Sequence, residues 1–191
     1  IKTRCIDADI VSDLVSHKLL YQDKRKNCVF VSYKDDNPVF ASLRGTSTYK
    51  RYLADVPGSD YSHLFFVDNG MDRLIIAESV IDTLSIATLL KQKGIDTRRF
   101  NYLALSGVGK YVKAINYQLE NFDYKKIYIC LDNDTSGKTA AEEIAMIISK
   151  KNKKTHIKKL FPKQGKDFNE YLTIICKDKE KKEDENNLCG K

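Results

Sequence analysis

The sequence predicts an α/β fold in which a mainly parallel sheet is flanked by helices. From residue 73 onward, short apolar runs alternate with segments whose apolar residues have helical spacing. The connecting segments have the length of right-handed crossovers between parallel strands. Several apolar runs also end abruptly in polar or acidic residues, which places those residues at one edge of the predicted sheet.

The elements of this part follow from the same periodicity. We expect four strands and four helices in alternation, with Gly94 ending the first helix because glycine tolerates the positive φ of a helix C-terminus. The expected strands cover 73–78, 102–107, 126–132 and 155–161, and the expected helices 80–93, 111–121, 140–151 and 167–176.

The first 70 residues have a different pattern, with an amphipathic helix expected within 6–20. Two strands are expected over 28–33 and 38–45 on either side of a short turn, and a further strand within 63–70. The segment between them is polar and rich in tyrosine, and a Pro-Gly pair marks a turn in it.

Three parts are therefore expected along the chain. They are a small helix-plus-hairpin module over 1–70, the α/β domain over 71–176, and a charged tail over 177–191 that is either a frayed helix end or a disordered linker.

Composition limits the classes of protein to consider. At 191 residues and 42% hydrophobic content, the chain fits one domain, or one domain with an appendage. No apolar run is long enough to span a membrane, and the first residues lack the apolar centre of a signal peptide. Because an initiator Met is also absent, we expect a piece of a larger multidomain protein.

Cysteine and histidine usage argues against zinc. The five cysteines form no CxxC pair, and the three histidines include no pair at helical spacing. Scattered cysteines in odd number are typical of a reducing compartment, so we expect a cytoplasmic protein.

The positive charge is concentrated in one segment. The net charge is +7, and residues 150–166 hold eight lysines and no acid. This segment is either a phosphate-attracting surface or a solvated helix end and loop. Its position directly after an acidic strand-helix unit favours a nucleic-acid partner.

Two aspartates mark the most informative strand end. The apolar run from residue 127 ends in Asp132 and Asp134, followed by Gly137 and a helix-like segment. Two carboxylates so close repel each other unless a positive charge lies between them, and Mg²⁺ prefers oxygen ligands. The alternatives are an ordinary turn, or capping of the next helix by Asp132 or Thr135.

Polar residues follow the other expected strands as well. Because ligands bind outside the carboxyl ends of the strands in open α/β sheets, these residues should share one edge. They are Glu78, Ser106 and Gly107, Asp132 and Asp134, and then Lys166, Asp167 and Asn169.

Four motifs carry a resemblance to a known family. IIAESVID (75–82), ALSG (104–107), LDNDTSG (131–137) and GKDFNEYL (165–172) resemble the successive motifs of Toprim domains. That family includes bacterial primases, type IA and II topoisomerases, OLD-type nucleases and recombination proteins. The resemblance covers about 73–175 and implies a Rossmann-like Toprim fold.

The resemblance also implies roles for the acidic residues. Glu78 would be the general acid or base, and Asp132 and Asp134, together with Glu78, would bind Mg²⁺ or Mn²⁺. Asp82 would lie near this site, or would be an exposed first-turn residue of its helix. Two positions depart from the family pattern, because Ser79 replaces a common glycine and Asn169 replaces a common acid.

Further residues are expected to accompany the site. Lys166 is expected either to neutralise a phosphate or to pair with Asp132. Asp167 and Asn169 are expected near the metal or as the cap of the last helix. Gly107 is expected to let the backbone approach a phosphate, or only to form a turn.

The N-terminal part adds a second resemblance. Residues 18–46 are similar to an uncharacterised module that precedes Toprim domains in proteins of bacterial plasmids and conjugative elements, often described as primase-like. Arg44 is expected to face the Toprim cleft or to be structural. The residues expected to contact nucleic acid are Arg44, Lys50, Arg51, Lys110, Lys138, Lys158 and Lys159.

The leading hypothesis is a Mg²⁺-dependent, primase-type Toprim domain of a mobile-element protein. It would act on DNA, in single-stranded form, and on nucleotides, as a nucleotidyltransferase. The alternatives are a Toprim nuclease that hydrolyses phosphodiesters at the same site, and a non-catalytic DNA-binding module.

Overall fold

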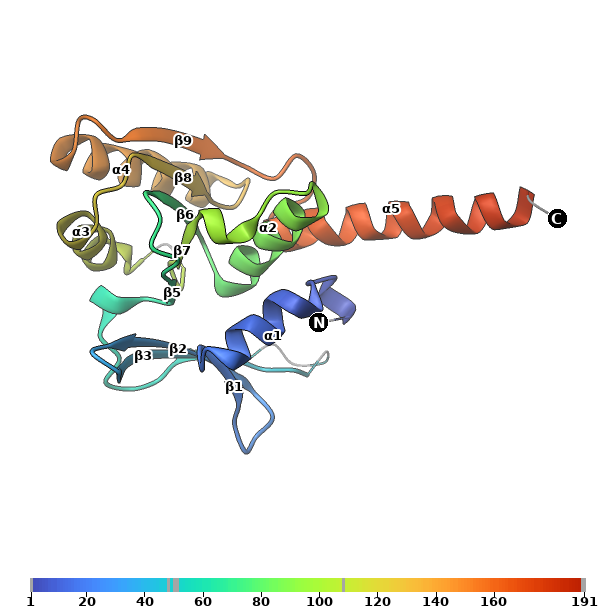
Figure 1. Ribbon diagram of the computed structural model, residues 1–191, viewed down its shortest axis with the longest axis horizontal. Helices are drawn as coiled ribbons and strands as arrows, with labels where there is room; N and C mark the ends of the chain where they lie inside the picture. Colours follow the sequence, from blue (N-terminus) through green and yellow to red (C-terminus); the bar gives the residue numbers. More distant parts are fainter. Residues whose placement is uncertain (1, 48, 50–51, 108, 190–191) are drawn as a thin grey trace.

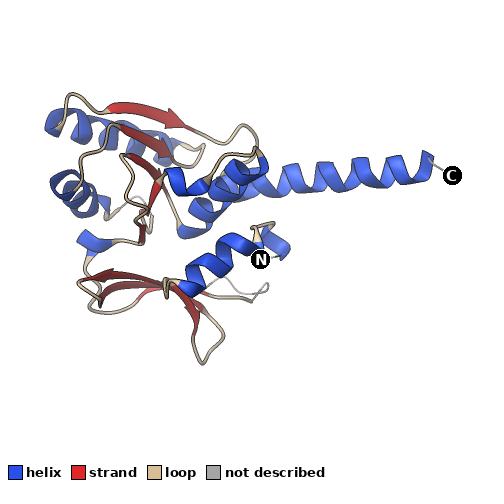
Figure 2. Ribbon diagram, in the orientation of Figure 1, coloured by secondary structure: helices blue, strands red, loops and turns tan. Residues whose placement is uncertain are grey.

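Two sheets and a set of helices make up the computed structural model, which describes residues 2–47, 49, 52–107 and 109–189. An antiparallel sheet from the N-terminal part lies beside a larger α/β unit, and helix α5 (Phe168–Cys189) extends away from both (Figures 1 and 2). The α/β fold class expected from the sequence is confirmed.

The larger sheet has the strand order β5-β7-β6-β8-β9. Strands β7, β6, β8 and β9 run parallel to one another. Strand β5 pairs antiparallel with β7 at one edge of the sheet. The strands are β5 (Phe66–Val67), β6 (Arg73–Ala77), β7 (Asn101–Ala104), β8 (Lys126–Cys130) and β9 (His156–Leu160).

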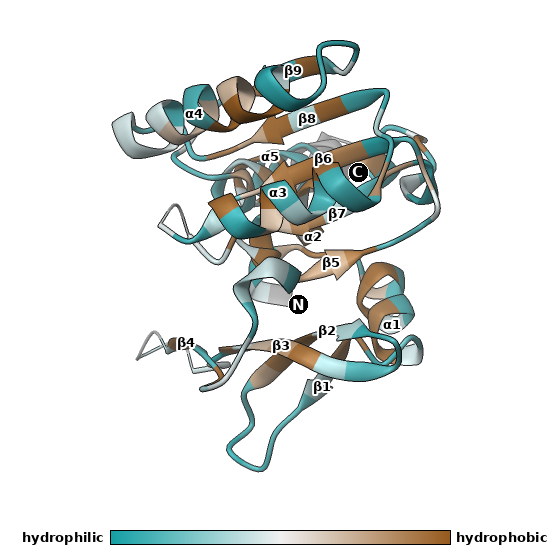
Figure 3. Ribbon diagram, turned by 90° about the vertical axis from the view of Figure 1, so that its left-hand side faces the viewer, coloured by the Kyte–Doolittle hydropathy of each residue, from teal (hydrophilic) through white to brown (hydrophobic). Residues whose placement is uncertain are grey.

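Helices cover both faces of this sheet. Figure 3 shows α3 and α4 on one face and α2 and α5 on the other. They are α2 (Val80–Gln92), α3 (Tyr111–Asn121) and α4 (Thr135–Lys151), besides α5. Because both faces are covered, the central strands are apolar along their length, and Leu74–Ala77 are all buried. The carboxyl ends of these strands are the positions left for polar chemistry.

The N-terminal sheet has the order β1-β2-β3-β4, and all its pairs are antiparallel. A two-residue turn joins β2 to β3, in which Asp35 and Asp36 have φ values of 49° and 61°. Positive φ at both central residues is the requirement of the hairpin turn that matches strand twist. The elements are α1 (Ala8–Ser16), β1 (Leu20–Gln22), β2 (Cys28–Lys34), β3 (Asn37–Arg44) and β4 (Leu53–Asp55).

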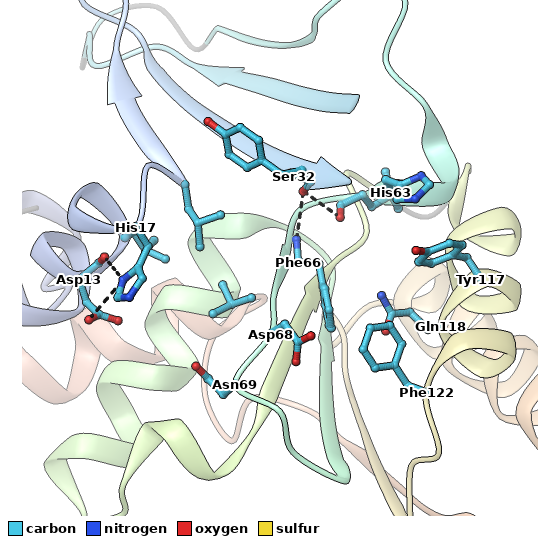
Figure 4. Close-up of a pocket in the computed structure, with 15 residues that line it drawn as sticks. Asp13, His17, Ser32, His63, Phe66, Asp68, Asn69, Tyr117, Gln118 and Phe122 are labelled. Carbon is cyan, nitrogen blue, oxygen red and sulfur yellow. Dashed lines mark hydrogen bonds and ion pairs between the residues drawn. The ribbon is translucent and has the colours of Figure 1, made fainter. Parts of the chain in front are cut away.

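Ser32 ties the N-terminal sheet to the α/β unit. Its hydroxyl donates to the Leu64 carbonyl at 3.1 Å and accepts from the Phe66 amide at 3.2 Å (Figure 4). Nearby, the rings of His63 and Tyr117 are 4.3 Å apart, which joins the short 3₁₀ helix Tyr61–His63 to α3. These contacts hold the two sheets in one arrangement.

The boundaries differ from expectation in several places. Strands β1 and β4 were not expected, since each is only three residues long and too short to show a period. The helix expected within 6–20 is confined to Ala8–Ser16, where Asp7 caps its first turn. Helix α4 starts at Thr135, before the expected 140.

The last helix is longer than expected. It continues past 176 to Cys189, so the described part of the charged tail is helical and contains no separate linker. The closing part of the α/β unit and the tail are therefore one element. Among the described residues, no helix combines the length and apolar composition needed to cross a lipid bilayer.

Gly137 allows α4 to approach the end of β8. A Cβ at this position would lie 2.3 Å from the Asp132 carbonyl oxygen. We predict that Gly137→Ala lowers the free energy of unfolding by roughly 1–3 kcal/mol, because backbone must move to relieve this overlap. Urea unfolding measures the change. Gly109→Ala is the control, since a Cβ there meets no atom within 4 Å, and equal losses in both variants would contradict the explanation.

Candidate active site at the carboxyl edge of the parallel sheet

The strand order reverses between β6 and β8, and polar residues gather there. From β6 the chain moves to β7 on one side, and it then crosses over to β8 and β9 on the other. Ligands of open α/β sheets bind at such a reversal, outside the carboxyl ends of the strands. The last pair of β6 and β8 is Ala77 with Cys130. Glu78 and Asp132 follow shortly after these strand ends, so they lie at nearly the same level of the sheet.

Glu78 is half-buried at this edge. Burial, followed by the charges of Asp82 and Asp134, raises its pKa, while a hydrogen bond from the Asp132 backbone acts in the opposite direction. Its Oε2 atom is buried and has no hydrogen-bond partner. A buried acceptor without a partner is costly, so this oxygen is suited to receive a proton or a cation.

Asp132 and Glu78 line one cavity at this edge of the sheet, and Asp132 is 7% exposed. Burial, the charge of Glu78 and then those of Asp82 and Asp167 raise its pKa to about 7. Glu78 and Asp132, expected to converge from the sequence, are thus brought together by the fold.

Asp134 has a structural role as well. Its carboxylate accepts a hydrogen bond from the Gly137 amide at 2.8 Å, so it caps α4. The alternative cap expected at Asp132 or Thr135 is wrong, because the helix starts one residue after Asp134. The hydrogen bond from Gly137 and the contact with Lys166 lower the pKa of Asp134.

Lys166 connects the two aspartates. Its Nζ atom is 3.1 Å from Asp134 Oδ2 and 3.7 Å from Asp132 Oδ2. The hydrogen bond to Asp134 is the main reason that the pKa of Lys166 is raised. The pairing with Asp132 that was one of the two expectations for Lys166 is present in the structure.

Asp82 is not the exposed residue that one alternative expected. It is 6% exposed and accepts hydrogen bonds from the Ser79 hydroxyl at 2.5 Å and the Asn169 amide at 3.3 Å. Burial is the main cause that raises its pKa. The Ser79 hydroxyl caps α2 by accepting a hydrogen bond from the Asp82 backbone amide. This cap explains why a serine can replace the glycine that the Toprim pattern often has at this position.

Asn169 and Asp167 belong to the first turn of α5. Asn169 is buried, and its side chain bonds to Ser85 and to both the backbone and side chain of Arg4. Its role is therefore to join three segments, and it does not cap the helix. Asp167 is the cap, because its carboxylate accepts from the Glu170 amide at 2.7 Å.

The N-terminal sheet supplies the other wall of the site. Arg44 at the end of β3 lines one cavity of about 270 Å³ with Glu78, Asp82 and Gly107, and its charge lowers the pKa of Asp82. Gly107 has a φ of 91° and donates its amide to the Glu78 carbonyl at 3.1 Å. The positive φ explains why glycine occupies position 107. The hydrogen bond to the Glu78 carbonyl holds the loop after β7 beside Glu78.

Four lining residues of the N-terminal part were missed by sequence reasoning. They are Arg4, Phe30, Ser42 and Leu53. Leu53 lies on the unexpected strand β4, and Arg4 reaches the site through tertiary contacts with α5. The cap that Ser79 forms for α2 was readable from the sequence, because serine followed by an acid three residues later is typical of a helix start.

The lysines expected to contact nucleic acid differ in their surroundings. Lys110 already contacts Tyr61 at 2.8 Å and Asp55 at 3.8 Å, and Lys159 pairs with Glu142 at 2.5 Å. The others, Lys138 at the start of α4 and Lys158 on β9, are exposed. Lys50 and Arg51 lie outside the described residues.

A second hollow has different chemistry. It measures about 380 Å³ and lies where α1, β2, β5 and α3 meet (Figure 4). Polar residues that line it are used in structural hydrogen bonds, as Ser32 is, and Asn69 donates to the Phe100 carbonyl at 2.7 Å. The smaller, acidic cavity is therefore the better candidate for catalysis.

The acidic edge fits a hard divalent cation in the kind of atoms it offers. In the described ranges, no three Asp, Glu, His or Cys side chains are gathered closely enough to hold a metal ion. The available donors are nonetheless carboxylate oxygens, which Mg²⁺ prefers, and Glu78 Oε2 is buried without a hydrogen bond. Repulsion between Glu78 and Asp132 also favours a positive charge at this place.

The raised pKa of Asp132 predicts a pH effect on stability. Its pKa is 3.8 in an unfolded chain and about 7 in the fold, so the folded state binds more protons between these values. Stability without divalent cations should fall as the pH rises from about 4 to about 7. Asp132→Asn should remove part of this loss and raise the melting temperature at pH 8 relative to the unmodified protein.

Thermal unfolding at pH 5 and pH 8 in the presence of EDTA measures this effect. Asp123→Asn, at an exposed position away from the edge, is the control. The explanation fails if Asp132→Asn is less stable than the unmodified protein at pH 8.

Two solved structures with a similar fold contain primase domains. A bacteriophage T7 primase fragment of the primase-helicase protein matches with a TM-score of 0.58 and 21% identity, over 89% of this chain and 67% of that one. A chain from a T7 lagging-strand DNA polymerase assembly, with primase domains bound to an RNA/DNA hybrid and dTTP, matches with a TM-score of 0.61 and 21% identity. That match covers 96% of this chain and 88% of the other.

Sequence families divide the chain in two. Residues 1–70 match a family described as a protein of unknown function (DUF3991), and residues 75–172 match the family described as Toprim-like. No curated protein is significantly similar in sequence. The second match covers more than half of the chain, and the chain belongs to the Toprim-like family.

Proposed function

We propose that this protein is a Mg²⁺- or Mn²⁺-dependent primase-type domain that joins nucleotides on a DNA template. The observation that carries the proposal is the meeting of Glu78 and Asp132 in one cavity at the strand reversal. Support comes from the Toprim-like family and from the fold shared with primase fragments.

Asp132, Asp134 and Glu78 would hold the cation through their carboxylate oxygens, after side-chain movements that bring these oxygens closer together than they lie in the structure. When bound, the cation would neutralise phosphate charge and align the reacting phosphate. Asp82 is not proposed as a ligand, because both of its oxygens already accept hydrogen bonds from Ser79 and Asn169. Its contribution is to fix the start of α2 and α5 beside the site.

Glu78 would handle the proton in the reaction. Its raised pKa brings it closer to neutral pH, where a carboxyl group exchanges protons more readily with a hydroxyl. In nucleotidyl transfer, the proton leaves the attacking 3′-hydroxyl, a phosphodiester bond forms, and pyrophosphate leaves. Glu78 would accept that proton. The guanidinium group of Arg44, which lines the same cavity, would bind phosphate oxygens.

The template would bind along exposed lysines beside the carboxyl edge of the parallel sheet. Lys138 lies in the first turn of α4, close in sequence to the aspartates, and Lys158 lies on the edge strand β9. Lysines on such a surface bind phosphates without reading sequence. Single-stranded DNA as template and a larger mobile-element protein as parent belong to this proposal.

Substitution of the acidic residues tests the chemistry. We predict that Asp132→Asn with Asp134→Asn abolishes primer synthesis, because the cation loses both aspartates. Glu78→Gln should reduce the rate by about 10²–10⁴-fold, the usual contribution of a general base. Asparagine is chosen at 134 because it still caps a helix. Primer extension with labelled nucleotides and Mg²⁺ measures the rates, and Asp123→Asn is the control.

The same assay separates the related functions. Unchanged synthesis in the double variant would refute the mechanism. Metal-dependent cleavage of DNA without nucleotides would identify a Toprim nuclease instead. DNA binding that is indifferent to Mg²⁺ and persists in Asp132→Asn, with no reaction of either kind, would identify a binding module.

Salt dependence tests the proposed template surface. We predict that Lys138→Ala weakens binding of single-stranded DNA and reduces the slope of log K against log salt by about 0.7, the value for one lost phosphate contact. Fluorescence anisotropy at several salt concentrations measures the slope. Lys125→Ala is the control, because Lys125 precedes β8 at the opposite edge of the sheet. Equal slopes for all three proteins would exclude Lys138 from the interface.

A further inference from the structure

The contacts of Lys166 suggest more than charge neutralisation. Its ammonium group is within 4 Å of oxygens from both Asp132 and Asp134. These are the two carboxylates that offer themselves to a cation at this edge. The ammonium group of Lys166 and a divalent cation would therefore compete for the same two carboxylates.

The backbone of Lys166 is fixed independently of its side chain. Its amide donates to the Glu170 carboxylate at 2.7 Å, and its carbonyl accepts from the Asn133 amide at 2.7 Å. Gly165 precedes it with a φ of 76°, and a Cβ there would lie 2.8 Å from Glu170. The loop is thus held against both α5 and the aspartate loop.

The side chain, by contrast, is free to change direction. It is 61% exposed, and its position lies at the rim of the acidic cavity. A long exposed lysine side chain changes rotamer quickly and at little cost. The ammonium group can therefore leave the aspartates without any movement of the loop that carries it.

We propose that Lys166 is a built-in competitor of the divalent cation at Asp132 and Asp134, and that it turns outward when the cation binds. The proposal rests on the proposed metal-dependent function and adds a regulation of the same site. In the outward position the ammonium group is at the mouth of the cavity, where a phosphate of the substrate would meet it.

The competition predicts an unusual direction of change. Removal of an ammonium group that competes for the same two aspartates should tighten metal binding, by roughly tenfold for solvent-exposed ion pairs. A lysine that merely supports the site would produce the reverse, because its loss would disorder the aspartates.

Mn²⁺ binding to the full chain, measured by electron paramagnetic resonance of the free ion, tests the proposal. Lys166→Met should bind Mn²⁺ about tenfold more tightly, whereas Lys166→Arg, which keeps the charge, should not. Lys163→Met is the matched control, since Lys163 is an exposed lysine of the same loop. The melting temperature should also rise more on addition of Mn²⁺ in Lys166→Met than in the unmodified protein.

The outcomes separate this inference from the proposed function. If the unmodified protein binds Mn²⁺ and Lys166→Met binds it equally or more weakly, the competition is refuted while the metal-dependent function stands. If none of the four proteins binds Mn²⁺ at millimolar concentration, both fail. Tighter binding in Lys163→Met as well would show a general charge effect, which also refutes a specific role of Lys166.

Discussion

Repulsion among carboxylates at one sheet edge is the constraint on which this structure depends. The fold brings Glu78 and Asp132 out of neighbouring strands into a partly buried cavity, where the charge of Glu78 disfavours ionisation of Asp132. Asp82 adds a third carboxylate close by. Hydrogen bonds and the ammonium group of Lys166 offset part of the repulsion. Such concentrated negative charge costs stability, and proteins keep it where a reaction or a ligand uses it.

The surrounding elements hold this arrangement from several directions. Gly137 lets α4 begin against the end of β8, and its amide fixes Asp134. Asn169 joins α5, α2 and the N-terminal segment behind the acids. The N-terminal sheet closes the cavity with Arg44, opposite the acidic side. The site is therefore shared between the two sequence families that the chain matches, and neither part encloses it alone.

Much of the α/β unit could be read from the sequence, because its strands and helices have clear and different periods. The convergence at residues 78 and 132 followed from one rule, that parallel strands end at the same edge. What could not be read depends on tertiary contacts. The contact of Asp82 with Asn169 and the approach of Arg4 to α5 involve partners far apart in the sequence, with no local signal.

The hydroxyl of Ser32 has a significance beyond its two hydrogen bonds. It joins one sheet to the other, and the opposing walls of the acidic cavity belong to those two sheets. Loss of this hydroxyl would therefore loosen the contact between the two walls while leaving every acidic group of the cavity in place.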